Sequence, residues 1–191
     1  LSLSPSCFIF KTMFKVVKII LIALILSNVV SSAEAKVLYR HKSHKGFSAK
    51  SALLWDITND KIYFERNAQK RVYPASTTKV MTALLALEKL SLSDYVTVSS
   101  RVIGVQQTNL GFRAGEQYKV EDLIYACLLK SANDAAGVLA EAVGGTQENF
   151  VVMMNQRAAE LGAKSTNFAN AHGLPSKGPQ YTTAKDMALI F

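Results

Sequence analysis

Apolar and polar residues alternate along the first structured part of the chain and then change to a helical spacing. Residues 51–57 alternate over the length of a strand, residues 59–60 are the Asn-Asp pair of a tight turn, and residues 61–66 alternate again. The pattern predicts a β-hairpin with strands at 51–57 and 61–66. Pro74 cannot donate a hydrogen bond to a strand ladder, and we expect it to end the extended region and lead into a helix.

The helix expected after Pro74 has a broad apolar face. Its apolar residues recur three and four positions apart and form two adjacent stripes: Val80, Leu84 and Leu87, then Met81, Leu85 and Leu90. A wide apolar face is typical of a helix that is buried on several sides. We therefore expect this helix to lie deep in the core.

Helical spacing dominates the rest of the chain. Residues 94–101 are expected to be extended or loop-like, and residues 108–117 to be rich in turns. Further helices are expected at residues 121–130, at residues 134–143, from Thr146 to Leu161 and from Thr183 onward. Thr183 and Asp186 resemble a capping box. A hairpin followed by helices favours an α+β domain over alternating β-α units, and because two strands make no stable sheet alone, we expect more strands in the complete protein.

The N-terminal region has the composition of an export signal. From Met13 onward, two lysines precede the apolar run IILIALIL, and Ala-Glu-Ala at 33–35 has the small-x-small form that signal peptidase recognises. We expect residues 13–35 to be a signal peptide cleaved after its last alanine, and residues 1–12 to be a non-native extension upstream of the true start. An uncleaved membrane anchor is the alternative, although the apolar run is short for a membrane-spanning helix.

Composition and charge narrow the range of partners. Hydrophobic residues make up 49% of the chain, enough for a core, and the formal net charge is +8 at pH 7. An excess of basic over acidic residues favours anionic partners such as a membrane surface or an acidic polymer. The densest basic cluster, RHKSHK at 40–45, has the composition of a solvated tail. No basic run with interleaved aromatic residues occurs, so we expect no nucleic-acid partner.

The chain has two cysteines, Cys7 and Cys127. Cys7 precedes the expected signal peptide, so no disulfide framework is expected, and no metal-ligand spacing occurs. Cys127 stands among apolar residues. We expect it to be a small buried hydrophobe and not a nucleophile.

A serine and a lysine stand one turn apart where the expected helix begins. Ser76 and Lys79 form the only Ser-x-x-Lys in the chain. A serine hydroxyl is a weak nucleophile until a base removes its proton, and a lysine amine can do so only when burial or a neighbouring positive charge keeps it neutral. The spacing puts both side chains on one face of the helix, in the field of its N-terminus, which stabilises an oxyanion. We predict that Ser76 is a nucleophile and Lys79 its base.

Two alternatives to this pair remain open on the sequence. Ser76 could cap the helix beside a surface lysine. His172, in the HGLP segment, could act as the base with Asp186 orienting it, although Ser76 lacks the G-x-S-x-G setting of such nucleophiles. Otherwise His172 is expected to fix its own loop by hydrogen bonds.

Three small residues, Ser-Ala-Asn at 131–133, interrupt two apolar helical segments. Polar groups at such a place are costly to bury without partners. A hydroxyl there can relay a proton and an amide there can hold a substrate carbonyl, so we predict Ser131 as a catalytic residue and Asn133 as a substrate-binding residue. A second Ser-x-Asn at 165–167 lies in a loop, where either residue suits a turn cap.

These motifs, in this order, resemble those of the D-alanyl-D-alanine carboxypeptidases, which are low-molecular-mass penicillin-binding proteins of the serine type. The resemblance runs from about Lys50 to the end of the chain. It is carried in turn by YPASTTKVMTALLALE, by GFRAGE with VEDLIYACLLKSANDAA, by AEAVGGT with FVVMMNQRAAELGA, and by HGLP with TTAKDMA.

The resemblance implies a role for each candidate residue. Ser76 would be acylated by the penultimate D-alanine of a peptidoglycan stem peptide that ends in D-Ala-D-Ala, and Lys79 would accept its proton. Ser131 would pass the proton to the leaving D-alanine, and Asn133 would contact the substrate backbone. Water would then release the acyl-enzyme. β-Lactam antibiotics would acylate Ser76 in place of the substrate.

The resemblance also implies a fold and no cofactor. The fold would be β-lactamase/transpeptidase-like, with an antiparallel sheet flanked by helices and a helical subdomain that contributes the second motif. No metal and no organic cofactor are implied. The expected signal peptide predicts that the protein is exported to the periplasm or cell envelope, and its basic charge favours association with a membrane surface.

The chain departs from the family pattern in its third motif, because no Lys-Thr-Gly or Lys-Ser-Gly occurs in it. We therefore expect residues 36–191 to be the N-terminal portion of a D,D-peptidase domain whose C-terminal strands are missing, and to be inactive alone. In such a portion the hairpin face with Leu54 and Tyr63 and the apolar face of the Ser76 helix are expected to be exposed. The alternatives are a non-catalytic or inactive truncated relative and a β-lactamase; the lack of an E-x-x-L-N segment argues against the latter.

Overall fold

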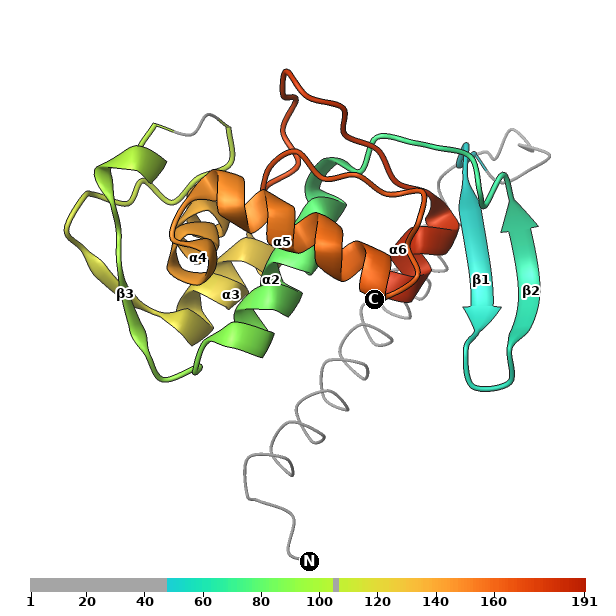
Figure 1. The fold of residues 1–191 in the computed structure, drawn as a ribbon, viewed down its shortest axis with the longest axis horizontal. Coiled ribbons are helices and arrows are strands. Elements are labelled where there is room, and N and C mark those ends of the chain that lie inside the picture. The colour runs from blue at the N-terminus through green and yellow to red at the C-terminus, as the bar shows by residue number, and fades with distance from the viewer. Residues whose placement is uncertain (1–47, 105–106) are drawn as a thin grey trace, which may run out of the picture. The chain divides into compact units, whose positions relative to one another are not determined.

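The computed structural model describes residues 48–104 and 107–191 (Figure 1). The chain divides into two units, residues 1–48 and 49–191, and all the described helices and strands belong to the second. The expected signal peptide, its cleavage site and the basic cluster at 40–45 lie outside the described residues. Within the described ranges, no helix is both long enough and apolar enough to cross a membrane.

The predicted hairpin is present, with its first strand one residue shorter at each end than expected. Strand β1 (Ala52–Asp56) pairs antiparallel with β2 (Lys61–Arg66). At the turn, one oxygen of the Asp56 carboxylate accepts from the backbone N–H groups of Thr58 and Asn59, at 3.0 and 3.2 Å. A short acidic side chain that bonds its own backbone two or three residues on is what closes such a turn.

Helices make up most of the regular secondary structure in the described ranges: α2 (Thr78–Lys89), α3 (Val120–Leu129), α4 (Asn133–Gly144), α5 (Gln147–Glu160) and α6 (Ala184–Ile190). These helices confirm the sequence expectation to within about two residues at their ends. Thr146 caps α5 by accepting from the backbone N–H of Asn149, at 3.1 Å. Thr183 caps α6 in the same way through the N–H of Asp186, at 3.0 Å. Both threonines thus satisfy a backbone donor that a helix start leaves unpaired.

A second small sheet closes one end of the helical group. Strands β3 (Tyr95–Thr97) and β4 (Gln117–Lys119) pair antiparallel, and a short 3-10 turn, η3 (Ser100–Val102), follows β3. This arrangement agrees with the extended and turn-rich segments expected there. Two small antiparallel sheets with a larger group of helices make an α+β fold, as predicted.

The core of the described unit lies among the helices, with α4 in contact with α2, α3 and α5. Met81 and Leu85 of α2 are 0% and 2% exposed, and they belong to one cluster with Leu139 of α4 and Phe150 of α5. The prediction from the apolar pattern that this helix lies deep in the core is therefore confirmed, and the expectation that its apolar face would be exposed is wrong. Helices α3, α4 and α5 cover that face, and each large side chain so buried contributes about 1.5–3 kcal/mol.

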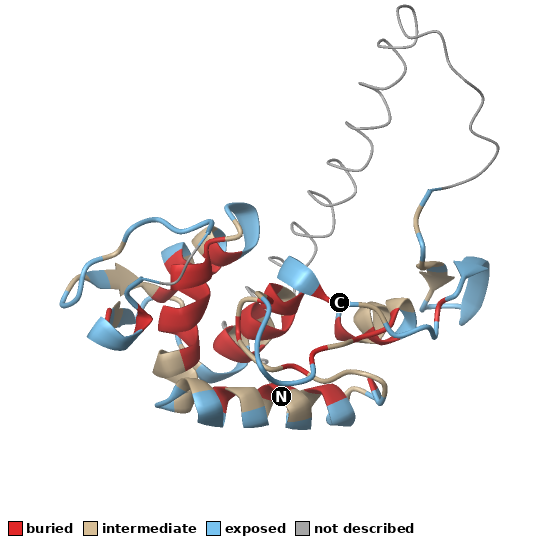
Figure 2. Cartoon of the chain, turned by 90° about the horizontal axis from the view of Figure 1, so that it is seen from above, coloured by how far each residue is buried: buried red, intermediate tan, exposed pale blue. Residues whose placement is uncertain are grey.

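The hairpin differs from the helices in burial, as Figure 2 shows. Leu54 on β1 is 60% exposed and Tyr63 on β2 is 59% exposed. Every residue of β2 is exposed, as expected from the sequence. The hairpin therefore contributes little to the core of the described unit, and the helices carry most of the burial.

Two threonines one turn apart on α2 make a matched test of buried hydrogen bonding. Thr78 and Thr82 are each 0% exposed. The Thr82 hydroxyl donates to the Ala171 carbonyl at 2.6 Å, whereas the Thr78 hydroxyl has no partner among the described residues. Because an unpaired buried hydroxyl costs about 1–3 kcal/mol, we expect Thr78→Val to raise the free energy of unfolding by about that amount.

The control is Thr82→Val, which leaves the Ala171 carbonyl without its donor and should lower the free energy of unfolding. Both values come from urea unfolding of the complete gene product. Equal effects of the two substitutions would contradict the assignment of the unpaired hydroxyl to Thr78.

Candidate active site

Ser76 lies on a short 3-10 turn, η2 (Ala75–Thr77), directly ahead of α2. The sequence predicted a helix start at this serine, and the structure becomes α-helical two residues later, at Thr78. The residues at the two N-cap positions are Pro74 and Thr77. Ser76 is therefore not the capping residue, and its side chain is exposed.

Lys79 is buried, at 2% exposure, with its amine facing three oxygens. Its Nζ lies 3.4 Å from Ser76 Oγ, 3.2 Å from Ser131 Oγ and 2.9 Å from the carbonyl oxygen of His172. The alternative of a surface lysine beside a capping serine is thus excluded. The structure brings the three predicted catalytic side chains together around one nitrogen.

Ser131 reaches Lys79 because the chain turns sharply between α3 and α4. Its φ is +55°, in the left-handed region that non-glycine residues rarely adopt. The turn is tied by two main-chain bonds, from Ala132 N to the Ala126 carbonyl at 3.1 Å and from Asn133 N to the Thr108 carbonyl at 2.8 Å. Asn133 begins α4 and is 3% exposed, and its contact with a substrate stays a prediction.

Burial changes the proton affinity of the amine. It lowers the pKa of Lys79 below its ordinary value of 10.5, while the neighbouring Cys127 acts in the opposite direction. Burial also raises the pKa of the Cys127 thiol to about 12, so this side chain stays a neutral thiol, and its predicted burial is confirmed. A lysine with a lowered pKa is neutral more often, and only the neutral amine can accept a proton.

The three oxygens satisfy Lys79 in both of its protonation states. A neutral amine has two N–H donors and one lone pair, and an ammonium has three donors. The His172 carbonyl can only accept, so it takes one N–H in both states, and Ser131 Oγ can take the second. The lone pair then faces the hydroxyl of Ser76. A proton can therefore move from Ser76 to Lys79 while the other two hydrogen bonds stay in place.

The His172 carbonyl belongs to a segment, residues 171–173, that runs along the start of α2. Its three consecutive carbonyls each accept from a different side chain: Ala171 from Thr82 Oγ1 at 2.6 Å, His172 from Lys79 Nζ at 2.9 Å, and Gly173 from the Tyr73 hydroxyl at 2.9 Å. Because the two outer bonds hold the segment on either side, the position of the middle carbonyl against Lys79 is fixed.

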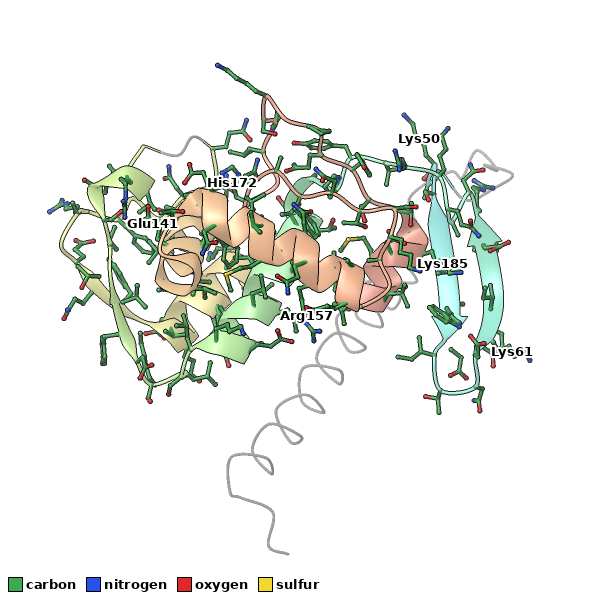
Figure 3. All side chains as sticks on the ribbon, viewed as in Figure 1. Lys50, Lys61, Glu141, Arg157, His172 and Lys185 are labelled. Atoms are coloured by element: carbon green, nitrogen blue, oxygen red, sulfur yellow. The ribbon has the colours of Figure 1, made fainter. Side chains whose placement is uncertain are left out.

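The imidazole of His172 bonds within its own loop (Figure 3). Its Nδ1 accepts from the backbone N–H of Leu174 at 3.1 Å. The Asp186 carboxylate accepts from the N–H of Ser165 and the hydroxyl of Thr166, at 2.7 and 2.8 Å. The alternative of a His172–Asp186 base is therefore not assembled, and the expected loop-fixing role of His172 is confirmed.

The second Ser-x-Asn, at 165–167, has a structural role. The Thr166 hydroxyl shares a hydrogen bond with that of Thr182 at 2.8 Å, and Asn167 donates through Nδ2 to the Pro179 carbonyl at 2.6 Å. These bonds join residues 166–167 to residues 179–182. Of the two Ser-x-Asn copies, the structure places only the one at 131–133 beside Lys79.

The sequence did not reveal the main-chain acceptor at His172. The HGLP string was a signal, but it drew attention to the imidazole, whereas the group that contacts Lys79 is a carbonyl that any residue would have. Among the described residues, no group of three His, Cys, Asp or Glu side chains lies close enough together to hold a metal ion. The cluster around Lys79 offers two hydroxyls for proton transfer and nucleophilic attack, and an amine whose pKa is lowered by burial.

Comparison with known proteins agrees with this chemistry. Residues 38–191 match the family model described as D-alanyl-D-alanine carboxypeptidase. The chain is 34% identical over 183 residues to D-alanyl-D-alanine carboxypeptidase DacF of Bacillus subtilis, covering 93% of this chain and 47% of that protein. It is 37% identical over 153 residues to D-alanyl-D-alanine carboxypeptidase DacC of Escherichia coli, covering 74% of this chain and 38% of that protein. The chain thus spans less than half the length of these relatives.

Solved structures give the same result for the fold. The structure of D-alanyl-D-alanine carboxypeptidase DacD from Francisella tularensis matches with a TM-score of 0.72 at 35% identity, over 78% of this chain and 37% of that one. Penicillin-binding protein D2 from Listeria monocytogenes, in its ampicillin-bound form, matches with a TM-score of 0.67 at 31% identity. The match covers 78% of this chain and 62% of that one. The predicted penicillin-binding-protein fold is therefore confirmed.

The His172 imidazole gives the fold a measurable dependence on pH. Burial, with a smaller effect from the nearby Lys79, lowers the pKa of His172 from 6.5 to about 4. Between these two pH values the unfolded chain binds a proton at His172 that the folded chain does not. The neutral imidazole therefore costs the folded state no stability above pH 6.5, and the free energy of unfolding falls as the pH drops toward 4. We expect the unfolding midpoint of the complete gene product to decrease over this window.

The matched control is His172→Asn, which has no titrating ring. Its unfolding midpoint should fall less steeply between pH 6.5 and 4, because the other titrating groups are common to both proteins and the contribution of His172 is absent. Parallel pH profiles for the two proteins would show that His172 is not protonated on unfolding.

Proposed function

Because this chain belongs to the D-alanyl-D-alanine carboxypeptidase family, we propose that it carries the acylation apparatus of an exported, serine-type D-Ala-D-Ala carboxypeptidase that trims peptidoglycan stem peptides. The observation that carries the proposal is the buried Lys79 amine, which lies within hydrogen-bonding distance of both Ser76 and Ser131. A serine hydroxyl needs an adjacent base to become a nucleophile, and this amine lies where such a base is needed.

In the acylation step, neutral Lys79 takes the proton of Ser76, and Ser76 Oγ attacks the carbonyl carbon of the penultimate D-alanine. The tetrahedral intermediate then collapses, the bond to the terminal D-alanine breaks, and its nitrogen leaves with a proton. Ser131, which shares Lys79 as a partner, is placed to pass that proton from the ammonium to the leaving amine. Asn133 is the proposed contact for the substrate backbone.

The position of Ser76 ahead of α2 supports the attack electrostatically. Its backbone N–H lies at the positive end of the helix, where partial charge stabilises an oxyanion. By the family resemblance, a second donor and the substrate carboxylate site come from the strand of the Lys-Thr-Gly motif, which does not occur in these 191 residues. The 191 residues alone are therefore proposed to be inactive.

Water would next attack the acyl carbonyl, releasing the trimmed peptide and restoring Ser76. β-Lactams are proposed to acylate the same hydroxyl, because their strained amide occupies the place of the D-Ala-D-Ala bond. The ampicillin-bound and cefotaxime-bound forms of Listeria penicillin-binding protein D2 support this for the family. A β-lactam adduct that persists separates a carboxypeptidase from a β-lactamase, which would hydrolyse it.

We propose that residues 13–35 direct export and that the mature chain begins at Lys36, outside the cytoplasm, with its basic N-terminal cluster at 40–45 near an anionic membrane surface. Mass-spectrometric sequencing of the exported protein should find Lys36 as the first residue. Retention of Met13 in the envelope fraction would favour an uncleaved anchor.

The catalytic assignment predicts the behaviour of two variants of the complete gene product with a fluorescent penicillin. Ser76→Ala should abolish labelling, and peptide mapping of the wild type should place the adduct on Ser76. Lys79→Arg keeps the positive charge but cannot act as a base. It should slow acylation about 10²–10⁴-fold while the protein still folds, because general-base catalysis contributes that much.

The pH profile adds a second measurement. The acylation rate of the wild type should rise with pH and level off below pH 10.5, because burial lowers the pKa of Lys79. An adduct on another residue would refute Ser76 as the nucleophile, and a Lys79→Arg variant that labels at the wild-type rate would refute Lys79 as the base.

A further inference from the structure

Gly173 approaches the turn that carries Ser76 more closely than any side chain would allow. Its φ is +82°, and a Cβ placed on it would lie 1.8 Å from the carbonyl oxygen of Ala75 and 3.0 Å from Thr78 Oγ1. Carbon and oxygen atoms that are not bonded stay more than about 3 Å apart. Two independent reasons therefore require glycine at this position: its backbone is left-handed, and there is no space for a side chain.

Ala75, the residue that Gly173 touches, is itself in an uncommon conformation. Its φ is +47°, although it has a side chain. A non-glycine residue in this region costs on the order of 1–3 kcal/mol and persists only where its surroundings hold it. Ala75 directly precedes Ser76, so its backbone angles set where the Ser76 hydroxyl lies. The Ala75 carbonyl accepts from the backbone N–H of Thr78 within the turn, and Gly173 packs against the same carbonyl from the 171–173 segment.

The same segment also holds the base. The His172 carbonyl accepts from Lys79 at 2.9 Å, and the Gly173 carbonyl accepts from the Tyr73 hydroxyl at 2.9 Å. The nucleophile is thus fixed through Ala75 and the base through His172, by two adjacent residues of one segment. The distance between the two reacting groups depends on how closely that segment lies against the turn.

We propose that Gly173 is a positioning residue for the acylation of Ser76: by lacking a side chain, it lets the 171–173 segment hold the Ser76 turn and Lys79 in register for proton transfer. The proposal rests on the proposed function of Ser76. It assigns Gly173 no contact with the substrate, and it predicts an effect on the rate of acylation and not on the affinity for the ligand.

The expected size of the effect follows from the geometry. The Nζ–Oγ distance of 3.4 Å is already long for proton transfer. An added Cβ must displace the Ala75 carbonyl by more than an ångström, and a misplacement of about 1 Å costs on the order of 10²-fold in rate. Gly173→Ala should therefore slow acylation by a fluorescent penicillin about 10²-fold, with the concentration for half-saturation nearly unchanged.

Gly115→Ala is the matched control. Gly115 has a φ of +88°, nearly that of Gly173, but a Cβ on it would meet nothing within 4 Å. Both substitutions impose the same backbone cost, so both should lower the unfolding midpoint, but only Gly173→Ala should slow acylation. Equal acylation rates for the two variants would overturn the proposal.

A measurement that does not depend on activity separates this proposal from the proposed function. Hydrogen–deuterium exchange of the amides at 75–82 should be faster in Gly173→Ala than in Gly115→Ala, with equal exchange in α5. If the wild type fails to label with penicillin, the proposed function is refuted and the exchange comparison still decides the positioning role. Equal exchange at 75–82 in the two variants would overturn it.

If Gly173→Ala does not fold, Tyr73→Phe tests the same proposal. It removes the hydroxyl that donates to the Gly173 carbonyl and accepts from Gln180 Nε2 at 3.1 Å, and it introduces no collision. Faster exchange at 75–82 and slower acylation than the wild type, with α5 unchanged, would support the role of the segment. Wild-type exchange and acylation in this variant would overturn it.

Discussion

The burial of one amine is the constraint on which the rest of this structure depends. Lys79 is 2% exposed, and a charged group taken out of water is costly unless it is paired or becomes neutral. Within the described part of the chain, no carboxylate is bonded to Lys79. It faces two hydroxyls and a carbonyl. These oxygens satisfy the amine without fixing its charge, so burial can lower its pKa and leave it able to exchange a proton.

That constraint joins three distant parts of the chain. Ser131 and His172 are 52 and 93 residues from Lys79 in sequence. Ser131 arrives through the sharp turn between α3 and α4, and the His172 carbonyl arrives through a segment bonded along α2. Because α2 is covered by α3, α4 and α5, each of these contacts is anchored in the helical core.

Sequence reasoning succeeded where chemistry depends on side chains and on local spacing. Ser76 and Lys79 are one turn apart, and the interruption at Ser131 stands out between apolar helices, so both were predictable. The carbonyl of His172 was not, because every residue has one and only the fold decides which is used. The broad apolar pattern of α2 correctly predicted a buried helix. The exposure expected for its face was wrong because that expectation assigned the cover to missing strands, whereas α3, α4 and α5 of this chain supply it.

The hairpin and the helical group differ in burial, and this difference affects which of them the proton transfer depends on. The hairpin is largely exposed, with Leu54 at 60%, whereas the residues around Lys79 are held by the helices. None of the three oxygens at Lys79 comes from β1 or β2, so the proton-transfer geometry does not require the hairpin to be fixed in place. Two left-handed residues, Ala75 and Ser131, lie at this geometry. Since each costs on the order of 1–3 kcal/mol, the helical core must supply the stability that keeps both serines aimed at the amine.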